Sequence, residues 1–460
     1  MEEELPETIE ECHRLIRSLL AVIGRMQVEI DELKAKVNEN SQNSNRPSSS
    51  DGFKKPKAAF GRGKGRRGGQ FGHRGNTLKR VENPDLIVDC EPQSCLCGKP
   101  EWKSAGEITE TRQVFEMPEP RLEVIEYRRV KRMCKCGRSV FGEFPAQVAG
   151  TVQYGEKVQA LVSLLSVHGC LSYGKIGQLF ADLYGYELNE ATAQKMVRKT
   201  SERMPMSAIK AEIIKSETVN FDETGLTENG KLKWLHNAST AKWTYQYVHE
   251  KRGTEAMTDE KSVLPEFKGV AVHDCWGSYF SFSEMKHAIC NAHLLRELNG
   301  IIENSGTKWA VKMKELLLDM YRQSDFGKGI IAEIGNYQES YQAILEQAEK
   351  EEPPPARVNQ KGKLKRTKGR NLMERLRKHE ESVLRFAARS EVPFTNNQAE
   401  RDIRPTKIKQ KMSGGFRSEN GSQSYCRIQS FISSLRKQSR QVFQELLSVI
   451  EGNHFEVFQT

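Results

Sequence analysis

The first clear pattern of hydrophobic positions is a heptad repeat between residues 9 and 37. This 3.5-residue period is typical of a coiled coil, and β-branched residues at its first position favour a parallel dimer. We predict a coiled coil over residues 1–42; the alternative is an amphipathic helix packed on the chain's own core. The repeat consists of Ile9, Ile16, Ile23, Ile30 and Val37, with Cys12, Leu19, Met26 and Leu33 three residues after the first four.

Residues 43–84 carry no periodic hydrophobic pattern. A polar stretch comes first, and residues 54–80 then hold ten Lys and Arg, no acid and many glycines. This composition predicts disorder, and glycine keeps the backbone pliable enough for the charges to follow a phosphate backbone. We expect a basic linker that contacts DNA without reading its sequence, the alternative being a solvated linker. The residues expected at DNA are Lys54, Lys55, Arg62, Lys64, Arg66 and Arg67.

Residues 85–148 contain two short cysteine pairs with β-favouring sequence between them. Cys95 and Cys97 form one pair and Cys134 and Cys136 the other, and each pair is followed by glycine. Four thiolates in this pattern fit a tetrahedral structural zinc site, and glycine permits the tight turn that aims both sulfurs inward. We therefore predict a zinc-finger-like module. The one-residue spacing is below the usual two to four, Cys90 is an alternative ligand, and unligated thiols are the competing interpretation.

Residues 149–210 have a helical pattern. An apolar face at Val158, Leu161, Val162 and Leu165 is followed by a helix, a Gly-containing turn and a second helix that Asn189 is predicted to cap. The second helix carries Lys195, Arg198 and Lys199. This arrangement predicts either a helix-turn-helix DNA-binding unit or a plain helical packing unit.

Strand patterns replace helical ones between residues 215 and 285. Residues 218–226 predict a strand, residues 231–250 a hairpin, and residues 268–280 a further buried strand. Helical sequence then runs from Asn291 to about Ala388, interrupted by an exposed Pro- and Lys-rich loop at 349–371, and a last helical stretch is expected from about Tyr425 to Glu451. We predict a mixed α/β domain over 211–430 with a helical insertion at about 293–392, and a C-terminal helical segment over 431–460.

Length, charge and hydropathy narrow the functional classes. The 460 residues exceed one ordinary core and predict a multidomain α/β protein. A net charge of +10 and a pI near 9.0 favour an anionic partner such as nucleic acid. The mean hydropathy is −0.65, no apolar run approaches the ~20 residues of a membrane span, and the acidic N-terminus is unlike a signal peptide. We expect a cytoplasmic protein, associated with the nucleoid when bound to DNA, with no membrane partner.

Three acidic residues are candidates for a metal-dependent active site. Asp222 and Asp274 each follow an apolar run where a strand is expected to end. Glu400 is expected on the first turns of a helix that Thr395 caps, with Gln398 completing a capping box. Such an oxygen-rich pocket suits two Mg²⁺ or Mn²⁺ ions, which phosphodiester chemistry uses to activate the attacking oxygen and stabilise the leaving one. The competing interpretation is that these acids are ordinary surface charges.

Several local sequences occur in the order found in one transposon family. NFDETGL, VHDCWGSY, CNAHLLREL and TNNQAERDIRP, preceded by SSSDGFKKPK and GGQFGHRGNTL, resemble the insertion-sequence-66 family of bacterial and archaeal transposases. The likeness spans nearly the whole chain, although Cys-x-Cys replaces the more usual Cys-x-x-Cys, which leaves the zinc site in doubt. The resemblance implies a DDE transposase with an RNase H-like catalytic core, in which Asp222, Asp274 and Glu400 are the catalytic acids.

The same resemblance implies the reaction and the partners. Metal-dependent cleavage at the transposon ends would expose a 3′-hydroxyl that attacks target DNA by direct transesterification, and companion proteins of the same element would assist. A helical insertion explains the 126-residue interval between the second and third acids. A non-catalytic DNA-binding regulator and a two-metal nuclease of the same fold are the alternatives.

Other residues near the acids receive expected roles. Cys290 and His293 form a C-x-x-H motif, which taken literally is half of a zinc site. No matching second pair lies nearby in the sequence, so the motif is interpreted as a positioning element beside the active site, with an ordinary helix start as the alternative. Basic residues around Glu400 are expected to hold DNA phosphates. Pro405 is expected to interrupt the helix, so that Lys407 need not share the face of Glu400. Trp276 is interpreted as a core residue, with stacking on an extruded base as the alternative. The basic residues are Arg401, Arg404, Lys407 and Arg417.

Overall fold

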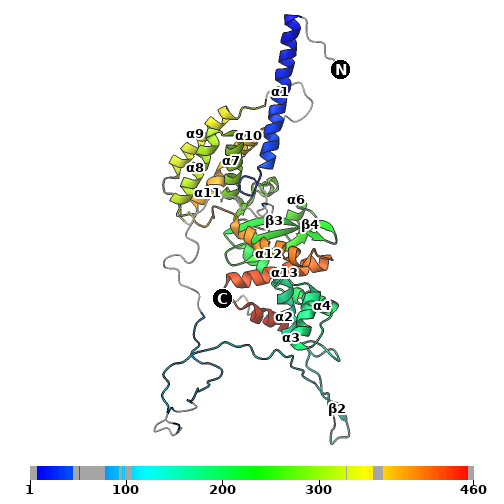
Figure 1. The fold of residues 1–460 in the computed structure, drawn as a ribbon. Coiled ribbons are helices and arrows are strands. Elements are labelled where there is room, and N and C mark those ends of the chain that lie inside the picture. Colours follow the sequence, from blue (N-terminus) through cyan, green and yellow to red (C-terminus); the bar gives the residue numbers. More distant parts are fainter. Residues whose placement is uncertain are drawn as a thin grey trace.

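The computed structural model describes residues 8–44, 51, 78–92, 96, 98, 106–327, 329–355 and 366–453. At its centre lies a mixed five-stranded sheet with the order β5-β4-β3-β6-β7 (Figure 1). Strand β4 is antiparallel to both of its neighbours, whereas β3, β6 and β7 run parallel. The strands are β3 (Thr218–Glu228), β4 (Lys231–Ser239), β5 (Thr244–His249), β6 (Val270–His273) and β7 (Lys286–Ile289).

The predicted strands and hairpin are present, and their turn chemistry explains the register. Strands β3 and β4 are joined at Asn229 and Gly230, which both have positive φ. An Asn-Gly pair with two left-handed residues is the preferred two-residue hairpin turn. Short strand β7 was not predicted, because its four residues give too little periodic signal. The mixed sheet with its flanking helices is consistent with the core of a DDE-type enzyme.

Strand β6 lies between two hydrophobic cores. Its residues alternate, so that Ala271 belongs to the larger core while Val270 and Val272 belong to the second. The larger core contains β3, β4 and β5 together with helices that contact strand β5 or pack on one another. These helices are α2 (Glu156–Val167), α3 (Tyr173–Tyr184), α4 (Glu190–Glu202), α5 (Met206–Ile214), α13 (Glu419–Lys437) and α14 (Val442–Glu451).

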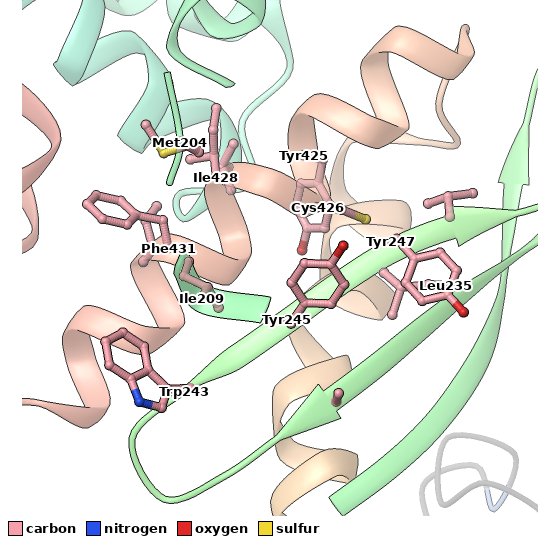
Figure 2. Packing of buried hydrophobic residues seen from close by; sticks show 14 of the residues in the cluster. Met204, Ile209, Leu235, Trp243, Tyr245, Tyr247, Tyr425, Cys426, Ile428 and Phe431 are labelled. Atoms are coloured by element: carbon pink, nitrogen blue, oxygen red, sulfur yellow. The ribbon is translucent and has the colours of Figure 1, made fainter. Parts of the chain in front are cut away.

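Helix α13 packs directly on strand β5. Figure 2 shows Tyr245 and Tyr247 of β5 facing Tyr425 and Cys426 of α13, with Phe431 further along the same helix. The last helical stretch was predicted from about Tyr425 to Glu451. It consists of α13, which begins earlier at Glu419, and a separate α14, because the chain turns at Ser439, which has a positive φ.

The second core is formed by the helical sequence after β7, which begins at Asn291 and ends at Ala388, as the hydrophobic pattern indicated.

Arg370 was predicted in an exposed loop, but it lies buried in helix α10 (Lys368–Lys378). There it binds Glu349 and Glu374, and these paired charges explain its burial. Residues 356–365 of that loop lie outside the described residues. The helices are α7 (Asn291–Ser305), α8 (Lys308–Gln323), α9 (Ile334–Glu351), α10 (Lys368–Lys378) and α11 (Glu380–Ala388), with short α6 (Thr254–Met257) and 3-10 helix η2 (Gly277–Ser281) preceding them.

Helix α1 (Ile9–Val37) extends away from the rest of the chain (Figure 1). Its heptad positions are exposed except for half-buried Cys12, with Ile16 at 52% and Ile23 at 60% of their accessible surface, so this face of α1 does not pack on the chain's own core. After the helix ends, Asn43 donates to Glu303 and Gln42 accepts from Asn299, both on α7. Among the described residues, no helix is long and apolar enough to span a membrane.

Candidate active site

Asp222 and Asp274 lie on neighbouring parallel strands. Asp274 directly follows β6, as predicted, but Asp222 is inside β3 and does not end it. The prediction failed because β3 has a different partner on each side. Its parallel pairing with β6 stops at Asn220, while its antiparallel pairing with β4 continues to Glu228. Asp222 therefore lies just beyond the point where the parallel pairing stops, beside Asp274.

Glu400 comes from helix α12 (Asn397–Ser413), which packs on β3 and β4. The predicted capping box is wrong, since the helix begins at Asn397 with Asn396 as its N-cap and without a side-chain cap bond. The side chain of Asn396 instead donates to the carbonyl of Phe221 in β3 and accepts from Asn220. Asn396 thereby fixes the start of α12 against the strand that carries Asp222. The amide of Gln398 bonds to Asp402.

Pro405 lies within α12 and does not interrupt it. An interior proline costs about 3 kcal/mol through its missing N–H and its clash with the preceding turn. Packing of the helix on the sheet offsets this cost, since Ile403 and Thr406 on either side are buried. Because the helix is continuous, Lys407 lies two turns from Glu400 on the same face, contrary to the prediction.

The three carboxylates are close enough to act on one another. Burial, the neighbouring Glu223 and the charges of Asp274 and Glu400 together raise the pKa of Asp222 well above its usual value. The Oε1 atom of Glu400 is buried and has no hydrogen-bond partner among the described residues. Both features are unfavourable in an isolated protein and would be relieved by a divalent cation. The donor set, which consists of carboxylate oxygens, fits Mg²⁺ or Mn²⁺.

A buried acid beside Asp222 was missed by the sequence analysis. The side chain of Glu223 accepts two hydrogen bonds from Arg252, at 2.9 and 2.6 Å, and one from the Tyr279 hydroxyl at 2.7 Å. Burial and the charge of Asp274 raise the pKa of Glu223. The guanidinium of Arg252 also lies 3.8 Å from Asp274. No local pattern reveals this network, because Arg252 follows β5 and reaches β3 only through the fold.

Trp276 is a partner of the same arginine. It packs against the larger core, and the Arg252 guanidinium carbon lies 4.2 Å from the centre of its ring. Trp234 on β4 lies 5.1 Å from that carbon. The two indole rings thus both contact the cation, an arrangement that stabilises a guanidinium. Trp276 contributes to the core, as the favoured interpretation of the sequence held.

Cys290 and His293 lie at the beginning of α7, beside Glu400. Cys290 is buried at the N-cap, and its sulfur accepts a hydrogen bond of 3.1 Å from the backbone N–H of Asn396. Burial acts to raise the pKa of the Cys290 thiol, but His293 and this N–H outweigh it and lower the pKa. Burial likewise acts against the charged form of His293, yet Cys290 and Glu400 raise its pKa to about 9. The C-x-x-H motif therefore adjoins the third acid, and its role as a positioning element stays a prediction.

The basic residues predicted around Glu400 are exposed. Arg401 donates to Gln398, and Lys407 donates to the carbonyl of Gly225 on β3. Arg404 and Arg417 are exposed as well, Arg417 just before α13. The cations of the predicted linker lie outside the described residues, except that Lys79 and Arg80 at its end are exposed.

The cysteine region is described only in part. Cys134 and Cys136 are exposed in a hairpin of β1 (Lys131–Met133) and β2 (Ser139–Phe141). Gly98 and Gly137, which follow the two pairs, have φ values of +74° and +83°, the left-handed geometry that the tight turn requires. Hydrogen bonds from the backbone and thiol of Cys136 lower the pKa of Cys134. Cys95 and Cys97 lie outside the described residues, so the zinc site stays a prediction.

The helical region before the sheet contains the predicted pair of helices. Helix α3 ends at Gly185 in a left-handed conformation, and Asn189 caps α4 by accepting from the Ala191 N–H at 2.8 Å, as predicted. Helix α4 buries Ala193 and Val197 in the larger core. The opposite face exposes three basic residues, Lys195, Arg198 and Lys199.

Comparison with known families identifies the chain. A family model described as Transposase IS66 family matches residues 151–424, which include the sheet, the helical insertion and α12. The chain belongs to this transposase family. A second model, described as a family of unknown function (DUF6444), matches residues 2–79, which include α1 and the start of the basic segment. No curated protein matches the chain. Membership of the transposase family supports a function in transposition, divalent-metal use and DNA as a partner.

Proposed function

We propose that this transposase cleaves the ends of its own transposon and joins the exposed 3′-hydroxyl to target DNA, using Asp222, Asp274 and Glu400. The observation that carries the proposal is the closeness of the three acids. Burial and the neighbouring carboxylates, Asp274 and Glu400 among them, raise the pKa of Asp222, and a buried Glu400 oxygen has no hydrogen-bond partner among the described residues. Carboxylates gathered at such a cost in a family of transposases are best explained by cation binding.

The proposed mechanism assigns a separate task to each element. Asp222 and Asp274, on adjacent strands, would hold one side of a pair of Mg²⁺ or Mn²⁺ ions, and Glu400 on α12 would hold the other. When bound, the ions lower the pKa of the attacking oxygen and neutralise charge on the leaving one. Arg401, Arg404, Lys407 and Arg417 would orient the DNA through its phosphates.

Strand transfer in vitro tests this proposal. Wild-type protein with DNA carrying the element's own ends should cleave and join in Mg²⁺ or Mn²⁺, and Asp222→Asn should abolish both steps while retaining DNA binding. Glu217→Gln is the matched control, because Glu217 is an exposed acid just before the same strand. Activity that survives Asp222→Asn would refute the assignment. Cleavage without joining would indicate a nuclease, and binding without either step a regulator.

We also propose that α1 pairs with α1 of a second copy as a parallel coiled coil. The support is a seam of exposed Ile, Leu, Met and Val side chains along a 29-residue helix. Ile23→Lys, in the middle of the seam, should convert the dimer to a monomer in light scattering. Ser18→Lys, which adds the same charge off the seam, should leave the dimer intact, and a monomeric wild-type protein would contradict this proposal.

Two further expectations remain proposals. Cys95, Cys97, Cys134 and Cys136 would hold one structural Zn²⁺, which release of zinc on thiol modification would reveal. The exposed basic face of α4 would add to DNA binding beside the linker cations. Replacing Lys195 and Lys199 by Gln should then weaken binding to DNA of any sequence and reduce its dependence on salt.

A further inference from the structure

One group of metal-ligating side chains in the described part of the chain combines sulfur, nitrogen and oxygen. The ligand atoms of Cys290, His293 and Glu400 all lie within 4.8 Å of one another. Two of the three residues also have a buried atom without a hydrogen-bond partner among the described residues, Nδ1 of His293 and Oε1 of Glu400. Unpaired buried polar atoms are costly, so two of them within a group of three neighbouring ligand residues indicate a missing partner.

The local structure holds this cluster in place. Cys290 is the N-cap of α7 and His293 is its third residue, so the two side chains lie one turn apart on one side of the helix. Glu400 reaches them from α12. The backbone N–H of Asn396, at the start of α12, donates to the Cys290 sulfur at 3.1 Å. Metal-bound sulfurs and imidazoles are commonly oriented by such outer hydrogen bonds.

The donor types select the ion. A thiolate and an imidazole are ligands that Zn²⁺ accepts readily and Mg²⁺ disfavours, because Mg²⁺ requires oxygen. Three protein ligands leave a fourth tetrahedral position open. We propose that Cys290, His293 and Glu400 bind a Zn²⁺ ion at a site that shares Glu400 with the carboxylate pocket. A Glu400 side chain engaged by zinc is withdrawn from Mg²⁺ or Mn²⁺, so zinc inhibits the enzyme; this second part rests on the proposed function.

Cobalt binding to the full chain tests the site without using activity. Co²⁺ replaces Zn²⁺ in such sites and gives a near-ultraviolet charge-transfer band only when a thiolate is bound. Cys290→Ser should lose one equivalent of bound Co²⁺ together with its share of that band, whatever the other cysteines bind. His293→Ala should lose the same equivalent. Cys275→Ser is the matched control, since Cys275 is a half-buried thiol outside the cluster, and should lose none.

The outcomes separate this site from the proposed function. Equal Co²⁺ stoichiometry and band intensity in wild type and Cys290→Ser, with both folded by circular dichroism, would overturn the zinc site. If Cys290→Ser loses one equivalent of bound Co²⁺ but the wild type shows no Mg²⁺-dependent strand transfer, the zinc site is supported and the proposed function is refuted. If both hold, one equivalent of Zn²⁺ beyond that held elsewhere should inhibit wild-type strand transfer, and uninhibited activity would overturn the shared role of Glu400.

Discussion

The buried ion pair between Lys437 and Asp402 should be a main determinant of how α12 is held. Lys437 Nζ in α13 lies 2.6 Å from Asp402 Oδ2, and the two side chains are 11% and 10% exposed. Lys437 also donates to the carbonyls of Thr240 and Trp243, at 2.9 Å each. The Asp402 carboxylate accepts from the hydroxyls of Ser239 and Thr244. Asp402 is two residues after Glu400, so this pair fixes the helix that carries the third acid.

Lys437→Met keeps most of the aliphatic chain and removes the charge and its donors. Loss of one partner from a buried pair costs about 3–5 kcal/mol, because the other charge stays buried without compensation. Two carbonyls that lose a donor add about 1 kcal/mol each at most, while the two hydroxyls that still serve Asp402 reduce the total. We therefore expect Lys437→Met to lower the free energy of unfolding by roughly 3–5 kcal/mol.

Urea unfolding followed by tryptophan fluorescence measures this loss. Adding Asp402→Asn to Lys437→Met removes the uncompensated charge and should restore roughly 2 kcal/mol, which a double-mutant cycle isolates. Lys268→Met, at an exposed lysine, is the control and should change stability by less than about 0.5 kcal/mol. A loss below about 1 kcal/mol for Lys437→Met, or no restoration by Asp402→Asn, would refute the reasoning.

Three further predictions concern the site and its attachment. Burial and neighbouring carboxylates raise the pKa of Asp222, so metal-free wild type should lose stability as the pH rises from the unfolded value near 4 through the raised value. In thermal unfolding, Asp222→Asn should remove that loss of stability. The difference in melting temperature between this variant and the wild type should grow as the pH rises and should close when Mg²⁺ is added. A Cβ at Gly300 would lie 2.3 Å from the Asn43 carbonyl oxygen, so Gly300→Ala should release the segment after α1 and speed tryptic cleavage after Lys36 without unfolding α7. Arg252→Lys keeps the charge but loses the two-point contact with Glu223, and should lower the free energy of unfolding by about 1–3 kcal/mol in urea titrations.

Much of the fold followed from local sequence because its signals are local. The strands of the predicted hairpin, the Asn189 cap and the start of the helical insertion at Asn291 each depend on a few adjacent residues. The placement of Asp222 within β3 did not follow, because the strand's end depends on where its partners end. The presence of Pro405 likewise predicted a break in the helix, but α12 packs on the sheet and continues through the proline.

The candidate site was predictable for the residues that lie in distinctive motifs. Asp222, Asp274 and Glu400 were singled out by sequence, and the structure brings their charges together. Asn396 and Glu223 lie in the same motifs, yet their contacts with Phe221 and Arg252 join residues far apart in the chain. Only the assembled fold reveals which polar residues contact the candidate acids and the segments that carry them.

The late position of Glu400 in the chain affects when the enzyme becomes competent during synthesis. Asp222 and Asp274 emerge from the ribosome long before α12, and α12 is held by Lys437, near the C-terminal end of the described chain. A nascent or prematurely terminated polypeptide that stops before α12 contains two of the acids and the basic linker but lacks Glu400. Such fragments would bind DNA without cutting it and would compete with the full-length protein, so incomplete translation products would act as inhibitors of their own element.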